Sequence, residues 1–278
     1  MLSSDELQEA FADPLLAPAQ NLYLRNQMAV ELRRLAGDDE APYTGDYLGV
    51  FVENGLRALA LFSRLGVLVV GGGCADDAAE LARFALGAVG SFRLVIAERE
   101  LGVALLARLA SRSTVTMNRS QPFLVYDAPA RTPSLDARVR PACQKDAAWL
   151  SLANLELNEE DLDIQSATVH RGLLRRRVED RIAAGQSWVL DFAGKPVSKL
   201  ELGSCGPAGI LVEGVFTDRG FRGRGFAQSL LMQVCAYGIP AHQCIGLHCS
   251  RSNGPALSAY KAAGFREVAD LRLACLRW

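Results

Sequence analysis

The stretch Val215-Phe216-Thr217-Asp218-Arg219-Gly220-Phe221-Arg222-Gly223-Arg224-Gly225-Phe226-Ala227 runs from an apolar strand, through a glycine-rich basic turn, into the start of an amphipathic helix. The first amides of a helix lack intrahelical partners and carry partial positive charge. Gly223 and Gly225 let an anion approach these amides, and Arg222 and Arg224 add cationic charge. The stretch therefore predicts a pyrophosphate site, although basic glycine turns also occur as ordinary solvated loops.

A second motif follows downstream. A β-like run over residues 244–249 precedes Asn253-Gly254-Pro255-Ala256-Leu257-Ser258-Ala259-Tyr260-Lys261-Ala262-Ala263-Gly264-Phe265. Asn253 is suited to cap a helix whose first turn tolerates Pro255, because first-turn amides need no intrahelical partner. Gly264 is suited to end that helix in a left-handed conformation. A last apolar run over residues 271–278 then predicts a closing strand.

The two motifs, Arg-x-x-Gly-x-Ala at residues 222–227 and Asn-x-x-Ala-x-x-x-Tyr-x-x-x-Gly-Phe at residues 253–265, occur here in a defined order. Together they resemble the GNAT superfamily of acyl-CoA-dependent N-acyltransferases, and its glycine N-acyltransferase-like branch in particular. The resemblance covers residues 136–278. Many relatives have a proline directly after the strand, whereas this chain has Asp218, which leaves the geometry of the turn open.

The resemblance implies an acyl-CoA-dependent N-acyltransferase, with acetyl-CoA or another acyl-CoA as co-substrate and an amine as acceptor. Backbone amides of Val215 and Thr217 would bind the pantetheine arm, and residues 222–227 would hold the pyrophosphate. The full set of residues that the resemblance assigns to the cofactor is Val215, Phe216, Thr217, Arg222, Gly223, Arg224, Gly225, Phe226, Ala227 and Asn253.

Acyl transfer to an amine of pKa about 10.4 requires the amine to lose a proton, so a general base is expected. Glu213 lies just ahead of the turn, where related enzymes often place a carboxylate; an exposed strand residue is the alternative reading. Tyr260 matches the family tyrosine near the thioester sulfur, or packs on the sheet. His248 is a secondary candidate for the base, or a packed strand histidine.

Seven cysteines are scattered without any Cys-x-x-Cys pair, and their odd number disfavours a disulfide framework or a zinc site. No metal site is expected. Because no cysteine has a recognisable activating partner, the sequence favours direct attack in a ternary complex over a covalent enzyme intermediate.

The composition sets wider limits. A chain of 278 residues accommodates two domains, and a net charge of -1 offers no general attraction to nucleic acid or an anionic membrane. The N-terminus is acidic and lacks an apolar signal core, and no apolar run approaches the ~20 residues of a spanning helix. A cytoplasmic protein is expected.

Residues 127–134 contain two prolines and predict a linker between two domains. We expect an α/β (α+β) fold of tandem GNAT-like units, each a mixed, mostly antiparallel sheet flanked by helices, with a degenerate unit at residues 1–130 and the catalytic unit at residues 136–278. The first unit has its own glycine turn at residues 71–77. Asp76 and Asp77 at that turn favour helix capping and repel phosphate, so this copy is expected to have lost its cofactor; a dinucleotide loop is the alternative.

The acidic segment at residues 156–163 is expected to be a connection between two helices. It either attracts a cationic amine or is a solvated loop beside the arginine-rich helix predicted at residues 170–184. Two alternatives to an enzyme of this kind stay open: a non-catalytic acyl-CoA-binding regulatory module, and an aminoacyl-tRNA-dependent transferase, which the near-neutral charge disfavours.

Overall fold

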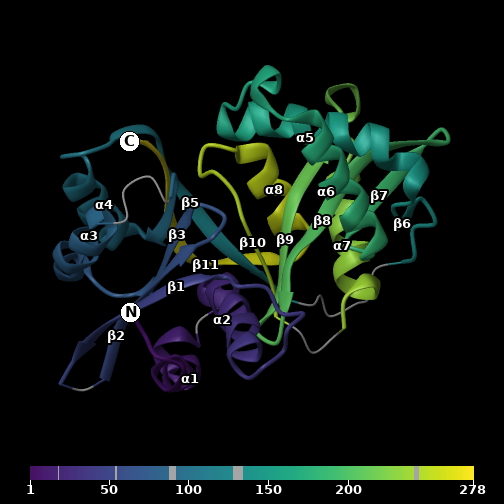
Figure 1. Cartoon of the computed structure of the whole chain (residues 1–278). Helices are drawn as coiled ribbons and strands as arrows, with labels where there is room; N and C mark the ends of the chain where they lie inside the picture. Colours follow the sequence, from purple (N-terminus) through teal and green to yellow (C-terminus); the bar gives the residue numbers. More distant parts are fainter. Residues whose placement is uncertain (18, 54, 88–91, 128–133, 241–243) are drawn as a thin grey trace.

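Figure 1 shows the computed structural model of the chain, which describes residues 1–17, 19–53, 55–87, 92–127, 134–240 and 244–278. The helices are α1 (Ser4–Ala12), α2 (Leu22–Leu35), α3 (Ala78–Gly87), α4 (Arg99–Leu109), α5 (Ala147–Leu162), α6 (Arg171–Ala183), α7 (Phe226–Gln233) and α8 (Gly254–Ala262). The strands are β1 (Gly45–Val52), β2 (Gly55–Ser63), β3 (Val67–Gly72), β4 (Leu94–Glu98), β5 (Thr114–Tyr126), β6 (Val139–Pro141), β7 (Ser187–Phe192), β8 (Lys195–Gly206), β9 (Gly209–Thr217), β10 (Ile245–His248) and β11 (Phe265–Arg277). Of the described helices, none combines the length and the apolar composition needed to span a bilayer.

All described strands join one 11-stranded sheet in the order β1-β2-β3-β4-β11-β5-β10-β9-β8-β7-β6. Strands β3 and β4 are parallel, as are β9 and β10, and the other neighbours are antiparallel. The two halves of the sheet are therefore built alike. Each is completed by the last strand of the other half: β11 pairs with β4, and β5 pairs with β10. In Figure 1 the yellow β11 and the teal β5 run through the middle of the molecule.

The helices cover the sheet in two layers. On β9, Ile210 packs in the cluster that contains α7 and α8, whereas its neighbour Leu211 packs against Leu22 of α2. On β7, Val189 packs with α5 and α6, whereas Leu190 packs with α7. Because successive residues of a strand face opposite sides, α2, α5 and α6 lie on one face and α7 and α8 on the other.

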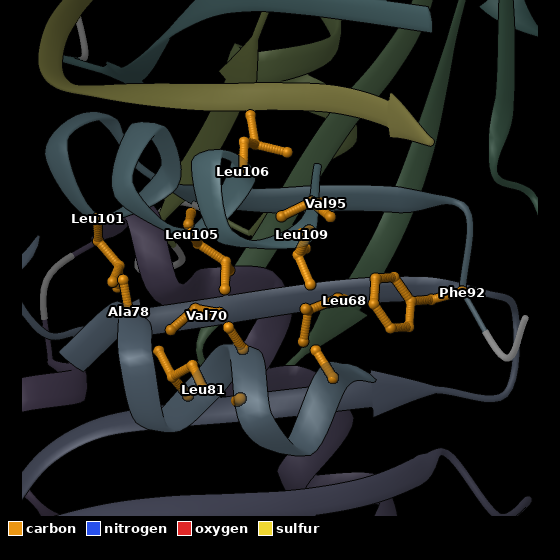
Figure 2. Close-up of a cluster of buried hydrophobic side chains, with 14 of the residues drawn as sticks. Leu68, Val70, Ala78, Leu81, Phe92, Val95, Leu101, Leu105, Leu106 and Leu109 are labelled. Atoms are coloured by element: carbon orange, nitrogen blue, oxygen red, sulfur yellow. The ribbon is translucent and has the colours of Figure 1, made fainter. Parts of the chain in front are cut away.

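The N-terminal half has its own core on the face opposite α2 (Figure 2). There α3 and α4 enclose a cluster that includes Leu68, Val70, Ala78, Leu81, Phe92, Val95, Leu101, Leu105, Leu106 and Leu109. The C-terminal residue of the chain joins this core, because the Trp278 ring stands edge-on to Phe92 at 5.2 Å and its indole N–H donates to the Phe92 carbonyl. The core of the first half thus contains residues from the end of the sequence.

The predicted fold class is confirmed, and the two expected sheets are joined into one. Two expectations about elements were wrong. The acidic segment belongs to the end of α5, and the final strand begins at Phe265 instead of residue 271. The predicted linker lies mostly outside the described residues, which leave out 128–133.

Candidate active site

The glycine turn ahead of α7 is open on the side of the helix amides. Gly225 is the N-cap of α7, and no described side chain caps this helix. Gly223 and Gly225 both have φ of 75°, and a Cβ at either would meet no atom of the described part of the chain within 4 Å. The glycines thus provide a left-handed backbone that other residues rarely adopt, and they leave the first amides of α7 unobstructed. The sequence left the geometry of the turn at Asp218 open. In the structure the chain forms a 3₁₀ turn there, in which Phe221 N–H donates to the Asp218 carbonyl at 2.8 Å.

Strands β9 and β10 separate beside this turn. Within the described residues they pair at Ile210 with Ile245 and at Leu211 with Gly246, although β9 continues to Thr217. Between Glu213 and Phe216, β9 bulges, with Gly214 at φ 60°. Val215 and Thr217 therefore lie in a part of β9 that has no ladder partner on the β10 side among the described residues.

The two arginines of the turn, Arg222 and Arg224, have different interaction partners. The Arg222 guanidinium donates to the Thr217 carbonyl at 2.9 Å and to the Glu160 carboxylate at 2.8 Å. Arg224 has no carboxylate partner within the described residues; its guanidinium lies over the Phe221 ring at 5.3 Å. Arg224 therefore keeps an uncompensated positive charge at the turn.

The Glu213 side chain lies beside Arg181 and over Gly203. The side chain is 40% exposed, and its carboxylate lies 3.7 Å from the Arg181 guanidinium of α6. A Cβ at Gly203, on the neighbouring strand β8, would lie 1.4 Å from Glu213 Oε1. The side chain thus lies flat across the glycine, in a slot that any other residue would fill.

A buried charged network next to Glu213 was missed in the sequence. Lys199 is fully buried, and its Nζ donates at 2.9 Å both to Glu201 Oε1 and to Asn154 Oδ1. Arg181 also donates to Glu201. Burial lowers the pKa of Lys199, against the charge of Glu201; burial alone would raise the pKa of Glu201, but the charges of Lys199 and Arg181 hold it at about 2. The only signal in the sequence is a lysine and a glutamate two apart in an otherwise apolar strand.

Tyr260 and Asn253 are both in α8 or at its start. Asn253 caps the helix, since its Oδ1 accepts from Ala256 N–H at 3.2 Å. Tyr260 is 6% exposed and packs 6.4 Å from the Phe265 ring. Burial raises the pKa of its hydroxyl above the ordinary value, so the hydroxyl stays protonated. Among the described residues that hydroxyl has no hydrogen-bond partner, and it can donate to a ligand.

His248 does not fit the role of base. Its Nδ1 contacts the side-chain amide of Gln121 on β5, and the amide orientation that satisfies both groups has Gln121 donating to Nδ1 while accepting from Arg119. The ring proton is then on Nε2. Burial, and next the charge of Arg119, lower the pKa of His248 to about 4. The histidine is a neutral link between β10 and β5, with its accepting nitrogen already used.

The glycine turn of the N-terminal half is filled by the protein itself. Asp77 is 1% exposed and accepts from Cys74 N–H at 2.9 Å and from Arg57 Nε at 2.6 Å. Leucine side chains close the remaining space, with Leu15 atoms 2.7 Å from a Cβ built at Gly72. A carboxylate and apolar side chains thus lie where the C-terminal half has an open turn. The described side chains also form no group of three or more acidic, histidine or cysteine residues arranged to hold a metal.

Comparison with known proteins agrees with this fold. Residues 149–265 match the model of the acetyltransferase (GNAT) family. Similar solved structures include a Drosophila protein, which is 14% identical over 99% of this chain and 97% of that chain, with a TM-score of 0.61. A GCN5-related N-acetyltransferase from Sphaerobacter thermophilus is 17% identical over 94% of this chain and 92% of that chain, with a TM-score of 0.54. A GNAT-family acetyltransferase from Colwellia psychrerythraea is 11% identical over 84% of this chain and 86% of that chain, with a TM-score of 0.53. A search of curated proteins gave no match. Residues 149–265, which lie in the C-terminal half of the chain, are thus similar to GNAT acetyltransferases.

Proposed function

We propose that the protein transfers an acyl group, in the first place acetyl, from acyl-CoA to a primary amine by direct attack in a ternary complex. The observation that carries this proposal is the separation of β9 from β10 directly beside the open glycine turn of α7. A strand that has no ladder partner on one side among the described residues suits the pantetheine arm, and helix amides beside Arg224 suit the diphosphate. The similarity of residues 149–265 to the GNAT acetyltransferase family supports the same reaction class.

The residues have separate roles in this reaction. The amine nitrogen forms a bond to the thioester carbon while the carbon–sulfur bond breaks and the electron pair leaves with sulfur. Glu213, directly or through a water, accepts the proton that the amine loses. Tyr260 donates a hydrogen bond to the departing sulfur; its raised pKa makes this donation more favourable than complete proton transfer to a thiolate of pKa about 8.5.

The cysteines support direct attack. Burial raises the pKa of Cys235 and Cys249 to about 12, and raises that of Cys205, Cys244 and Cys275 above the ordinary value. These thiols are protonated at neutral pH and are poor nucleophiles. A covalent acyl-cysteine intermediate is therefore disfavoured at these five positions.

Two measurements test the proposal. Titration calorimetry with acetyl-CoA is expected to show saturable binding that the R222A/R224A double variant weakens; unchanged affinity would remove the glycine turn as the diphosphate site. Acetylation of a panel of amines, amino acids and lysine peptides is expected to be detectable. Glu213→Gln and Tyr260→Phe are each expected to lower kcat by about a hundredfold without loss of acetyl-CoA binding, as is usual for acid–base groups.

The alternative function, acyl-CoA binding without catalysis, predicts a different result in the same measurements. Acetyl-CoA binding without acetylation of any amine in the panel would indicate a non-catalytic acyl-CoA-binding module. The likeness of the motifs to the glycine N-acyltransferase-like branch adds longer acyl groups to the proposal. Titration with propionyl-, butyryl- and benzoyl-CoA beside acetyl-CoA measures that preference.

A further inference from the structure

Glu160 brings a carboxylate from α5 into the glycine turn of α7. Its Oε1 accepts from Arg219 Nε at 2.9 Å, and its two oxygens accept from Arg222 Nη2 at 3.1 and 2.8 Å. Only 28% of the Glu160 side chain is exposed. Burial opposes ionisation, but hydrogen bonds from Arg222 and Arg219 hold the pKa of this carboxyl below its ordinary value. Glu160 is thus a fixed negative charge at the turn.

Carboxylate and phosphate oxygens compete for the same guanidinium donors, since both accept charge-assisted hydrogen bonds of similar length. Arg222 already donates Nε to the Thr217 carbonyl, and it uses Nη2 on both oxygens of Glu160. Arg224 has no such partner within the described residues. One of the two arginines expected to bind the diphosphate is therefore engaged by the protein's own carboxylate.

We propose that Glu160 is an internal competitor of the acyl-CoA diphosphate, which sets the affinity for CoA thioesters and is displaced from Arg222 when they bind. This inference rests on the proposed function of the glycine turn. It implies that Glu160 acts only against carriers that have a diphosphate, because a pantetheine thioester has no phosphate group to compete with the carboxylate.

Displacement has a structural consequence at the end of α5. The neighbouring Asp161 lies 3.5 Å from Arg119 of β5, and Asp163 ends the helix in a left-handed conformation with φ of 54°. The last turn of α5 is thus attached to the glycine turn through Glu160 and to the N-terminal half through Asp161. Release of Glu160 removes one of these two attachments, so acyl-CoA binding is expected to loosen this turn.

The test uses Glu160→Gln in the full chain, which keeps the size of the side chain and removes its charge. Acetyl-CoA is expected to bind about threefold to tenfold more tightly by titration calorimetry, since the free protein no longer has to break the ion pair. Glu156→Gln is the matched control: it removes the same charge one turn earlier, where the side chain is exposed and pairs with no described residue. Its affinity is expected to stay at the wild-type value.

Two further measurements separate competition from a general charge effect. The KM for S-acetylpantetheine, which lacks the diphosphate, is expected to be the same in wild type and Glu160→Gln. Amide hydrogen exchange in the last turn of α5, residues 158–163, is expected to be faster in the acetyl-CoA complex than in the free wild-type protein, and to be fast in both states of Glu160→Gln.

The outcomes are distinguishable. If wild type binds acetyl-CoA and R222A/R224A weakens binding, but Glu160→Gln binds no more tightly, the competition is overturned and the proposed function stands. Equal tightening by Glu156→Gln, or an equal change for S-acetylpantetheine, also overturns it. Absence of acetyl-CoA binding in both wild type and Glu160→Gln overturns the proposed function together with the inference. Equal thermal unfolding midpoints of the variants confirm that they fold alike.

Discussion

The position of Glu213 depends on the absence of a side chain at Gly203. The three atoms nearest to a Cβ at Gly203 all belong to Glu213, the most distant of them at 2.4 Å. Gly203→Ala is therefore expected to push the carboxylate out of its slot and to lower kcat about tenfold to a hundredfold, as misplacement of a reacting group does. Acetyl-CoA affinity, measured by calorimetry, is expected to change little.

Gly87→Ala is the control for this substitution, because a Cβ at Gly87 meets no atom of the described residues within 4 Å. Its kinetics are expected to equal those of wild type. A Gly203→Ala protein with wild-type kcat would mean that the orientation of Glu213 is unimportant for turnover. A loss of acetyl-CoA binding equal to the loss of kcat would mean that the added methyl group acts on the fold.

The buried pair of Lys199 and Glu201 predicts an acid-sensitive part of the stability. The pKa of Glu201 is about 2 in the folded protein, held down by Lys199 and Arg181 against the effect of burial, and about 4.3 when unfolded. A lowered folded pKa contributes stability that is present above the unfolded pKa and is lost as pH falls through the folded pKa. The free energy of unfolding is expected to fall by up to about 3 kcal/mol between pH 5 and pH 2 because of this group.

Urea denaturation at stepped pH measures this dependence. The K199M/E201L double variant replaces the ion pair by apolar side chains of similar size, a change that buried pairs often tolerate. Its unfolding free energy is expected to fall less steeply over the same range. Parallel pH curves for the two proteins would exclude Glu201 as the source.

At the scale of elements, local sequence patterns were sufficient to predict features that depend on the backbone conformation of single residues. The left-handed conformation of Gly264 and the cap at Asn253 follow from residue type and position, and the structure has both of them. The end of α5 could not be predicted in this way. Its acidic residues are unfavourable at the negative C-terminal end of a helix, and what holds them there is tertiary: Glu160 binds Arg222, and Asp161 contacts Arg119.

The start of α3 offers a prediction about the first glycine turn. Asp77 accepts from Cys74 N–H and pairs with Arg57, so Asp77→Ala is expected to lower the free energy of unfolding by about 1–2 kcal/mol. Acetyl-CoA stoichiometry is expected to stay at one per chain, because Leu15 and other side chains still fill that turn. Calorimetry that gives a second site in this variant would show that Asp77 alone excludes the cofactor.

At the scale of the whole molecule, the exchange of β5 and β11 was beyond prediction from sequence. Both runs are apolar enough to be recognised as strands, but nothing local specifies which half each completes. The same holds for Asn26 of α2, a buried residue that donates to the Gly209 carbonyl at 3.0 Å and accepts from Ala208 N–H at 3.0 Å. These contacts join residues about 180 positions apart, where pairing depends on the assembled sheet.

Because β5 and β11 each pair with a strand of the other half, the two halves are not expected to be independent folding units. A fragment of residues 1–130 lacks β11, which pairs with β4 and contributes Ala274 and Leu276 to the core of that half. A fragment of residues 136–278 lacks β5, and β10 is then left unpaired on one side. Each fragment alone is expected to show no cooperative thermal transition, whereas the two co-expressed are expected to purify as a complex that binds acetyl-CoA.

A protease site introduced between Asp127 and Ser134 of the intact chain gives the matched control, because it cuts the chain after the sheet has assembled. The cleaved protein is expected to stay associated through the long ladder between β5 and β11, and to keep its acetyl-CoA affinity. Its unfolding is expected to become concentration-dependent, since two chains separate on unfolding. Two separate fragments that each unfold cooperatively, at the midpoint of the intact chain, would mean that neither half requires the strand it receives from the other.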